Sequence, residues 1–278
     1  HDVVGFQTDI DQRSFVECVR SALPEARVRG SNITIGRWTC QAKVYPIGVD
    51  VDEIQSTARA GRASTPGRRL LESARGRRLI IGVDRLDYSK GLPQRFRAYQ
   101  HLLEDYPSHR GQTILLQIAQ PSRDDVPEYQ QIRETLERVA GRINGRFSDY
   151  DWTPLRYLNK GFARSTVIAF LANSDVGLVT PLRDGMNLVA KEFVAAQDAA
   201  APGALVLSEM AGAARELDAA ILVNPYDEQA VADAMARAVA MSNEERRERW
   251  EAMMKVLRRN DIHAWRRRFV DTLAKTTR

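Results

Sequence analysis

The sequence predicts an α/β protein built around a parallel, doubly wound sheet. From about residue 77 onward, short runs of aliphatic and β-branched residues alternate with segments of about 10 to 15 residues that have helical spacing of apolar positions. Several of the short runs end in polar loops that contain glycine. Because sheets of this kind bind ligands outside the carboxyl ends of their strands, a functional site is expected at those loops.

The first 60 residues hold too few elements to close a domain on their own. Runs rich in β-branched and aromatic residues predict strands, and one segment has the apolar spacing of a helix. Glycine and proline then mark a loop. The expected elements are strands at 3–7, 32–39 and 41–49, a helix at 11–23, a loop at 61–67 and a short helix at 68–74.

The alternating part of the chain carries the predicted sheet. Its expected strands are 78–83, 113–119, 176–180, 204–208 and 220–223, and its helices are 92–106, 127–140, 163–173, 188–198 and 227–241. Residues 140–159, with Gly141, Gly145 and Pro154, are expected to be irregular. Two helices, at 243–258 and 261–274, close the chain.

Composition and charge narrow the functional classes. The hydrophobic content of 44% and charged content of 28% are ordinary for a globular protein. The net charge is +5, but the signs alternate over 243–250, which is typical of a solvated helix face. The charge therefore favours an anionic small molecule over nucleic acid. No apolar run approaches the ~20 residues of a membrane span, and Cys18 and Cys40 are expected to be two buried thiols and not a disulfide, which favours the cytoplasm.

The most informative stretch is 180–192, where a strand runs through a polar turn into a helix that begins near Asn187. Backbone N–H groups at a helix start lie at the positive end of the helix dipole and attract phosphate or sugar oxygens. Asp184 can accept hydrogen bonds from hydroxyls, and Glu192 can reach a second hydroxyl-bearing group. Taken alone, Asp184 could equally be an ordinary helix N-cap, and Glu192 an exposed carboxylate.

A second loop of the same design follows the strand at 78–83. Arg85 and Lys90 lie on it, and Gly91 precedes the next helix. Two cations aimed at a diphosphate would stabilise the charge that develops when a sugar–phosphate bond breaks. The alternative pairs Arg85 with Asp84 or Asp87 and leaves Lys90 in solvent. Arg123, after the next strand, could hold another anion or lie at the surface.

Other motifs carry less chemistry. The segment 208–214 could line the same site, although a packing turn is the better interpretation. The histidines at 101, 109 and 263 have no partner spacing, and the sequence has no Walker lysine motif, zinc-ligand spacing or Ser/His/Asp arrangement.

Six segments together resemble the trehalose-6-phosphate synthase family, and the similarity runs in order along essentially the whole chain. They are 1–8 (HDVVGFQT), 44–48 (VYPIG), 85–91 (RLDYSKG), 140–145 (AGRING), 180–192 (TPLRDGMNLVAKE) and 221–226 (ILVNPY). The resemblance implies a GT-B fold, with two Rossmann-like domains facing a cleft. It also implies transfer of glucose from UDP-glucose to glucose 6-phosphate with retention of configuration.

The resemblance also implies a domain division and a missing part. The chain begins at His1 rather than methionine and lacks about the first 150 residues of the family, so it is expected to be cut from a longer chain and to have little or no activity alone. The expected division is a remnant of the amino-terminal, acceptor-side domain at 1–60, a linker at 61–76, the Rossmann-like donor-binding domain at 77–258, and a helix crossing back to the first domain at 259–278.

Site roles follow from the matching motifs. In the resemblance, Arg85 and Lys90 bind the donor diphosphate, Asp184 bonds the glucose hydroxyls, Glu192 meets the ribose, Arg123 contacts the acceptor phosphate, and His1 lies beside the transferred glucose. The backbones of Gly185, Met186 and Asn187 assist Asp184, and the amides of Leu188 and Val189 meet the phosphate end. His1, Arg85, Lys90 and Asp184 are the expected catalytic residues.

No cofactor or metal is expected, because the donor UDP-glucose is a substrate and the leaving phosphate takes the acceptor proton. Nucleic acid and membrane are not expected as partners either. A homo-oligomer is compatible with the sequence. Two alternatives stay open: a glucosylglycerol-phosphate synthase, which uses a different acceptor, and a non-catalytic sugar-nucleotide-binding module.

Overall fold

A computed structural model describes residues 1–122 and 126–276. The chain divides into two compact units, His1–Asp50 with Leu257–Arg278 (unit 1) and Val51–Val256 (unit 2). No helix in the described ranges is long and apolar enough to cross a membrane. Each unit has its own sheet and is described separately below.

Unit 2 contains a six-stranded sheet in which every pairing is parallel. In spatial order the strands are β10 (Ile221–Val223), β9 (Ala204–Ser208), β8 (Val176–Val179), β5 (Arg78–Arg85), β6 (Thr113–Gln120) and β7 (Leu155–Leu158). The chain starts at the centre with β5, winds outward through β6 and β7, and then returns to the other side of β5 with β8. Strand order therefore reverses between β5 and β8, where doubly wound folds bind their ligands.

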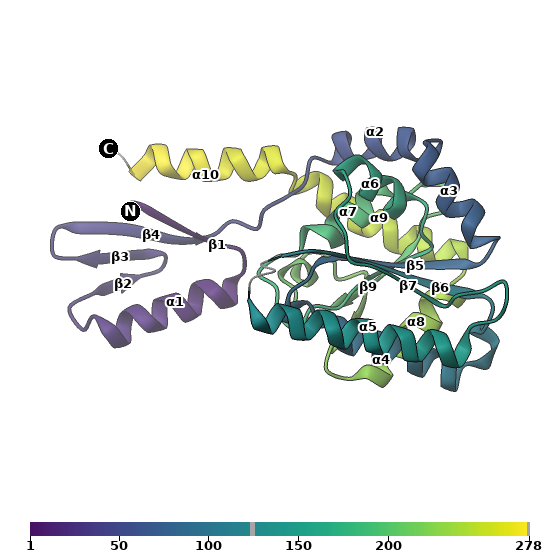
Figure 1. Ribbon diagram of the computed structural model, residues 1–278. Helices are drawn as coiled ribbons and strands as arrows, with labels where there is room; N and C mark the ends of the chain where they lie inside the picture. Colours follow the sequence, from purple (N-terminus) through teal and green to yellow (C-terminus); the bar gives the residue numbers. More distant parts are fainter. Residues whose placement is uncertain (123–125, 277–278) are drawn as a thin grey trace. The chain divides into compact units, whose positions relative to one another are not determined.

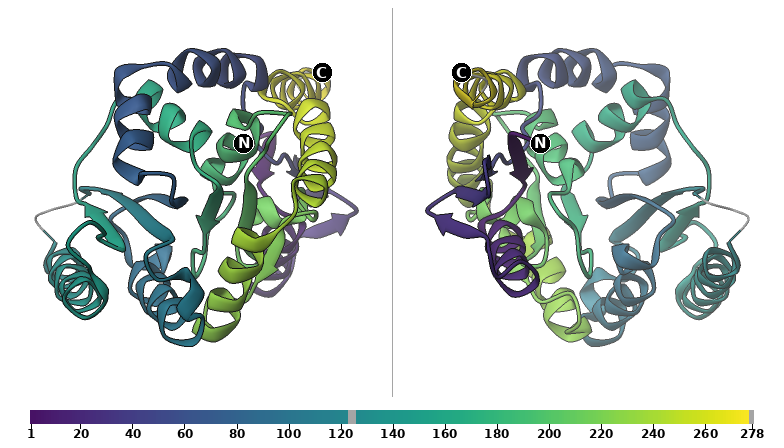
Figure 2. Two further views of the ribbon diagram at one scale, coloured as in Figure 1. Left: turned by 90° about the vertical axis from the view of Figure 1, so that its right-hand side faces the viewer. Right: turned by 90° about the vertical axis from the view of Figure 1, so that its left-hand side faces the viewer.

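Helices cover both faces of this sheet (Figure 1). One layer is formed by α4 (Leu92–Asp105), α5 (Pro127–Phe147) and α8 (Glu228–Ala240), and the other by α2 (Val51–Arg62), α3 (Thr65–Ala74), α6 (Arg164–Ala172), α7 (Leu188–Ala196) and most of α9 (Asn243–Arg259). Figure 2 shows the two layers with the sheet seen closer to edge-on. Three short 3₁₀ turns, η1 (Tyr88–Lys90), η2 (Pro107–His109) and η3 (Gly212–Arg215), lie in the connecting segments of the described chain.

The core of unit 2 is the sheet itself, because strands covered on both faces are mostly apolar along their length. Nearly every residue of β5, β6, β8 and β9 is buried. This burial explains why these segments read as continuous aliphatic runs and not as alternating ones.

Two parts of unit 2 differ from the expectation from sequence. In the segment expected to be irregular, 140–159, helix α5 continues to Phe147 and β7 forms at Leu155–Leu158. Side chains added at Gly141 and Gly145 would meet open space, so both glycines lie on a free face while Ile143 packs inside, and tertiary burial outweighs their helix penalty of about 1 kcal/mol each. Residues 51–76, expected to be the end of the amino-terminal remnant (to 60) and a linker (61–76), form α2 and α3 within unit 2.

Unit 1 contains a four-stranded sheet in the order β1 (Val3–Phe6), β4 (Trp38–Val44), β3 (Asn32–Ile35), β2 (Arg27–Arg29). β1 pairs with β4 in parallel, and the other pairings are antiparallel. Helix α1 (Asp9–Ala22) begins at the N-cap Thr8 and covers a small core of Val16, Ile33, Cys40 and Ala42. Both cysteines are free thiols, but only Cys40 is buried; Cys18 on α1 is exposed, so the expectation of burial was wrong for Cys18. Helix α10 (Ile262–Thr276) belongs to the same unit, where its Trp265 indole N–H donates to the Tyr45 carbonyl at 3.1 Å.

Candidate functional site

The loops after β5 and β8 meet at the carboxyl rim of the sheet in unit 2. The backbone N–H groups of Leu182 and Arg183 both donate to the Ser89 carbonyl, at 2.8 and 3.3 Å. Gly91 has a φ of 65°, and a side chain there would come within 2.8 Å of the Thr180 carbonyl oxygen. A glycine at position 91 therefore allows the two loops to touch.

Lys90 and Asp184 form the centre of this contact. The Lys90 ammonium lies 2.5 Å from the Asp184 carboxylate, and their side chains are only 14% and 16% exposed. The alternative with Lys90 in solvent is therefore wrong. Two residues that lie far apart in the sequence and were assigned independently to one site are in direct contact.

Arg85 is the last residue of β5 and is exposed. Its charge contributes to the environment of Asp87, whose pKa burial alone would raise. The backbone N–H and hydroxyl of Ser89 donate to Asp87 at 2.8 and 2.7 Å, and together with the Lys90 and Arg85 charges they lower the pKa of Asp87 below its usual value. A lowered pKa keeps this carboxylate ionised beside the two cations.

The turn between β8 and α7 is held by hydrogen bonds at both ends. The Asn187 side-chain amide donates to Asp184 at 3.1 Å, and the Met186 N–H donates to the same carboxylate at 3.4 Å. Asn187, with a φ of 72°, is the N-cap of α7, and its side-chain oxygen accepts from the Ala190 N–H. The interpretation of Asp184 as the cap is therefore wrong, and its carboxylate faces Lys90.

The segment after β9 packs against this turn and fixes its backbone. The Gly212 N–H donates to the Asp184 carbonyl at 3.0 Å, and the Ala213 N–H donates to the Met186 carbonyl at 2.7 Å. A side chain at Gly212 would come within 2.0 Å of the Gly185 oxygen. The segment 208–214 thus acts as a packing turn, and only glycine fits at its closest approach.

Helix α7 begins at this turn. Leu188 and Val189 supply its first amides, at the positive end of the helix dipole, and Glu192 follows on the same helix. The Glu192 side chain is only 18% exposed, so it is not a freely solvated carboxylate. Burial raises the pKa of Glu192, although a contact with Arg164 at 3.3 Å opposes the rise.

Sequence reasoning missed two arginines that contact and support the residues of the candidate site. Arg164 binds Glu53 through two contacts of 2.6 and 2.7 Å while also reaching Glu192. Arg95 forms a buried cluster beneath the two loops. Neither arginine lies in a recognisable motif, and their partners are distant in the chain, so no local signal marks them.

The arrangement of unit 2 does not include two of the predicted site residues, Arg123 and His1. Arg123 lies outside the described residues. His1 is exposed and precedes β1 in unit 1, so the arrangement of unit 2 carries no information about it. Their assigned roles remain predictions.

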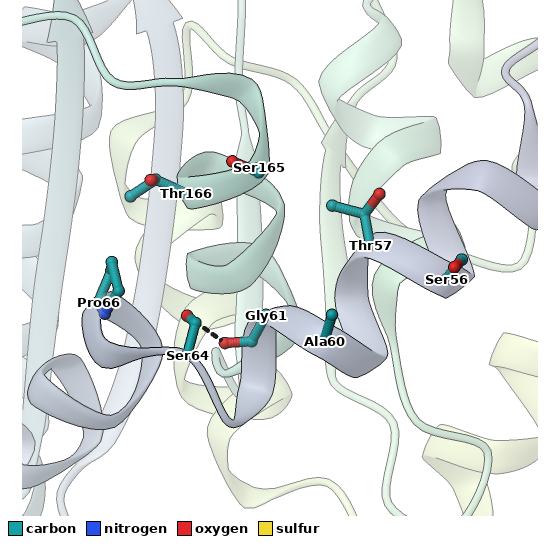
Figure 3. Close-up of a pocket in the computed structure, with 8 residues that line it drawn as sticks. All are labelled: Ser56, Thr57, Ala60, Gly61, Ser64, Pro66, Ser165 and Thr166. Atoms are coloured by element: carbon teal, nitrogen blue, oxygen red, sulfur yellow. Dashed lines mark hydrogen bonds between the residues drawn. The ribbon is translucent and has the colours of Figure 1, made fainter.

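A pocket of about 470 Å³ lies elsewhere in unit 2, between α2, α3 and the start of α6 (Figure 3). Its lining consists of small residues, some with hydroxyl groups and some apolar, and the Ser64 hydroxyl is already bonded to the Gly61 carbonyl at 2.7 Å. None of the predicted site residues lines it: the lining is Ser56, Thr57, Ala60, Gly61, Ser64, Pro66, Ser165 and Thr166. Among the described residues, no group of three or more His, Cys, Asp or Glu side chains could hold a metal ion.

The sequence profile of glycosyltransferase family 20 matches residues 1–275. The chain belongs to this family. A trehalose-6-phosphate synthase of Enterobacter sp. (strain 638) is 49% identical over 277 residues, which cover 100% of this chain and 58% of that protein. The chain therefore spans little more than half the length of this curated relative.

Solved structures of trehalose-phosphate synthases have nearly the same fold as this chain. A UDP-forming trehalose-phosphate synthase from Burkholderia xenovorans, in complex with glucose-6-phosphate, has a TM-score of 0.95 and 48% identity over 98% of this chain and 60% of its own. An E. coli structure bound with UDP-2-fluoro glucose has a TM-score of 0.94 and 48% identity over 98% of this chain and 60% of its own. The predicted α/β fold of the GT-B type is confirmed.

Proposed function

We propose that unit 2 binds UDP-glucose at the rim between β5 and β8, as the donor-binding part of a retaining glucosyltransferase. The reaction would transfer glucose from UDP-glucose to glucose 6-phosphate, giving trehalose 6-phosphate and UDP. The observation that carries the proposal is the Lys90–Asp184 contact, which joins the two loops at the reversal of strand order. The ligands named for the family 20 structures described above support the choice of substrates.

The cationic side of the site would hold the diphosphate. Arg85 and Lys90 follow β5, and the first amides of α7, at Leu188 and Val189, lie on the neighbouring loop. Breaking the sugar–phosphate bond leaves negative charge on the departing UDP. Cations and helix-start amides that are already fixed in place stabilise that charge more in the transition state than in the ground state.

The carboxylate side would hold the sugar. Asp184 is an acceptor for glucose hydroxyls, and the backbone of Gly185, Met186 and Asn187 lines the same turn. Lys90 compensates the buried charge of Asp184 and, with three N–H donors, can serve a phosphate oxygen as well. Glu192 on α7 would meet the ribose hydroxyls.

Retention of the anomeric configuration determines which bonds break and form, and on which face of the sugar. The bond between the anomeric carbon and the phosphate oxygen breaks, and a bond from that carbon to the acceptor oxygen forms on the same face. The acceptor hydroxyl gives its proton to the leaving phosphate, so the site needs cations and no covalent nucleophile. His1 and Arg123 keep their predicted roles beside the transferred glucose and at the acceptor phosphate.

Further predictions from the sequence belong to the same proposal. They are a cytoplasmic location, no cofactor beyond the donor substrate, and little or no transfer by the 278-residue chain alone. Incubation of the chain with UDP-glucose and glucose 6-phosphate tests the last of these, because rapid formation of trehalose 6-phosphate would contradict it.

Calorimetric titration with UDP-glucose tests donor binding. Lys90→Ala and Arg85→Ala should each weaken binding by about 10- to 100-fold, because a charge-assisted hydrogen bond contributes about 1.5–3 kcal/mol. Arg78→Ala is the matched control, since Arg78 is an exposed arginine at the opposite end of the same strand. Its dissociation constant should change by less than about twofold.

Equal affinities for all four proteins, or no saturable binding by the unsubstituted chain, would contradict the proposed donor site. Parallel titrations with ADP-glucose and GDP-glucose test the choice of nucleotide. A preference for either of them over UDP-glucose would leave the donor site in place but reject UDP-glucose as its substrate.

A further inference from the structure

A buried polar cluster lies directly beneath the two loops of the candidate site. The Arg95 guanidinium, on α4, contacts Asp84 of β5 at 2.5 Å and the Gln117 side-chain oxygen of β6 at 2.7 Å. Its Nε donates to the Thr180 hydroxyl at 3.0 Å. One side chain thus links the end of β5 and the middle of β6 to the residue that follows β8.

Stability alone does not explain this cluster. The Arg95 and Asp84 side chains are 0% and 3% exposed, and burying two charges costs about as much as their attraction returns. The Arg95 Nη2 also has no hydrogen-bond partner among the described residues, which adds a further cost. A cluster of this kind is better explained by the geometry that it fixes.

Two of the segments that meet at Arg95 carry the proposed donor contacts. Asp84 directly precedes Arg85, and Thr180 opens the turn that contains Asp184. Arg95 itself lies in the first turns of the helix that follows Lys90 and Gly91. A shift of the guanidinium would therefore move the two cations relative to the Asp184 carboxylate.

The strand makes room for this arrangement. A side chain at Gly82 would come within 2.3 Å of the Gln117 oxygen and within 2.7 Å of the Arg95 Nη1. The missing side chain at Gly82 of β5 therefore leaves the space that the Arg95 guanidinium and the Gln117 amide occupy.

We propose that Arg95 is a positioning residue that fixes the distance between the Arg85–Lys90 loop and the Asp184 turn, and so sets the affinity for a sugar nucleotide. This inference rests on the proposed function. Arg95 does not touch the donor in this proposal. It acts through Asp84 and Thr180, each of which is tied to one of the two loops.

Two variants separate geometry from charge. Arg95→Lys keeps a positive charge beside Asp84, but a single ammonium cannot reproduce the planar fork that reaches Asp84, Gln117 and Thr180 together. The double variant Asp84→Asn with Arg95→Gln removes both charges and leaves no buried charge unpaired. Tyr99→Phe is the control, because Tyr99 is a fully buried residue of the same helix whose hydroxyl bonds the Thr113 and Pro154 carbonyls, away from the loops.

Hydrogen exchange is the first readout, because it needs no ligand. In both Arg95 variants the amides of Leu182 and Arg183, which bond Ser89 across the two loops, should exchange about tenfold faster, in excess of any change that the strand amides of unit 2 show. The UDP-glucose dissociation constant should rise about tenfold. Tyr99→Phe should lower the melting temperature and leave the exchange of these amides and the affinity unchanged.

Unchanged exchange at Leu182 and Arg183 in both variants would overturn the inference, and so would increased exchange with unaltered UDP-glucose affinity. Failure of the unsubstituted chain to bind UDP-glucose would instead reject the proposed function. In that case the exchange rates alone would still decide whether Arg95 holds the two loops together.

Discussion

Glu192 is a carboxylate under opposing influences. Burial disfavours its ionised form and raises its pKa, while the Arg164 guanidinium favours ionisation and holds it in place. Arg164 is in turn anchored by Glu53 on α2, so the orientation of Glu192 depends on residues in three helices. A buried acceptor held by a shared arginine is suited to receiving hydroxyl donors without moving.

Glu192→Gln should change the pH dependence of stability. Because folding raises the pKa of Glu192, its stabilising contribution is present at low pH and is lost as the pH rises through the folded-state pKa. The variant should therefore gain free energy of unfolding relative to the unsubstituted protein over the pH range above about 4.5, the ordinary pKa of a glutamate carboxyl. Urea unfolding of both proteins across this range measures the difference, and a constant difference would contradict the assignment.

At the residue scale, the sequence predicted the position of the loop residues at the rim of the sheet better than that of the buried arginine beneath them. Lys90 and Asp184 lie in polar loops after strands, so their position at one rim followed from the rule for parallel sheets. Arg95 reads as an ordinary helix residue, and its partners become neighbours only when β5, β6 and β8 are aligned. Which arginine is buried depends on tertiary packing, which no local pattern records.

At the scale of the element, α7 begins in an uncommon way. Its N-cap, Asn187, adopts a left-handed backbone conformation and uses both ends of its side chain, one for the Ala190 N–H and one for Asp184. Asparagine tolerates that conformation better than most residues, and its oxygen is a good cap. The residue therefore joins the start of the helix to the proposed sugar contact.

Replacing Asn187 tests both parts of this role. Asn187→Ala should lower the free energy of unfolding by about 2–3 kcal/mol. The variant loses the cap, and alanine at positive φ has no polar side chain whose local hydrogen bonds offset the strain. Asn187→Gly keeps the backbone conformation and should cost less. Urea unfolding compares the two, and equal losses would show that backbone conformation contributes nothing at this position.

Helix boundaries were the weakest part of the prediction at this scale. Two glycines in the second half of α5 suggested irregular structure, yet they lie on a face where a side chain would meet only open space. Helix α2 was missed because its buried face is made partly of small residues, Ala58 and Gly61, with only Val51 and Ile54 as large apolar signals. In both helices the tertiary environment outweighed local propensity.

At the scale of the whole molecule, the two units have separate cores of different size. Unit 1 relies on a small cluster around Ile33, which is 2% exposed, whereas unit 2 buries a six-stranded sheet. The proposed donor contacts at Lys90, Asp184 and Glu192 all lie in unit 2. Stability of one unit and donor binding by the other should therefore be separable.

Ile33→Ala should destabilise unit 1 by about 2–5 kcal/mol, as expected for truncation of a buried isoleucine. The UDP-glucose dissociation constant should change by less than about twofold if binding resides in unit 2. Hydrogen exchange by residue, with a parallel titration, measures both effects. A large loss of affinity together with the loss of stability would assign part of the donor site to unit 1.

The overall architecture was accessible because alternation of strands and helices leaves few alternatives to a parallel sheet. Aliphatic runs such as Leu79–Ile81 could only be central strands. The short β7, at Leu155–Leu158, was missed because it lies in a segment with proline and glycine nearby. Edge strands carry weak signals, since few of their residues are fully buried.

The Lys90–Asp184 pair also governs how the rim responds to its surroundings. Without ligand, the ammonium and the carboxylate already neutralise each other, so the pair needs no counter-ion from solution. An arriving diphosphate shares an ammonium that is already partly neutralised, while Arg85 remains more exposed to the solvent. Dissolved electrolyte should therefore screen the attraction of Arg85 for the donor more strongly than that of its sheltered neighbour.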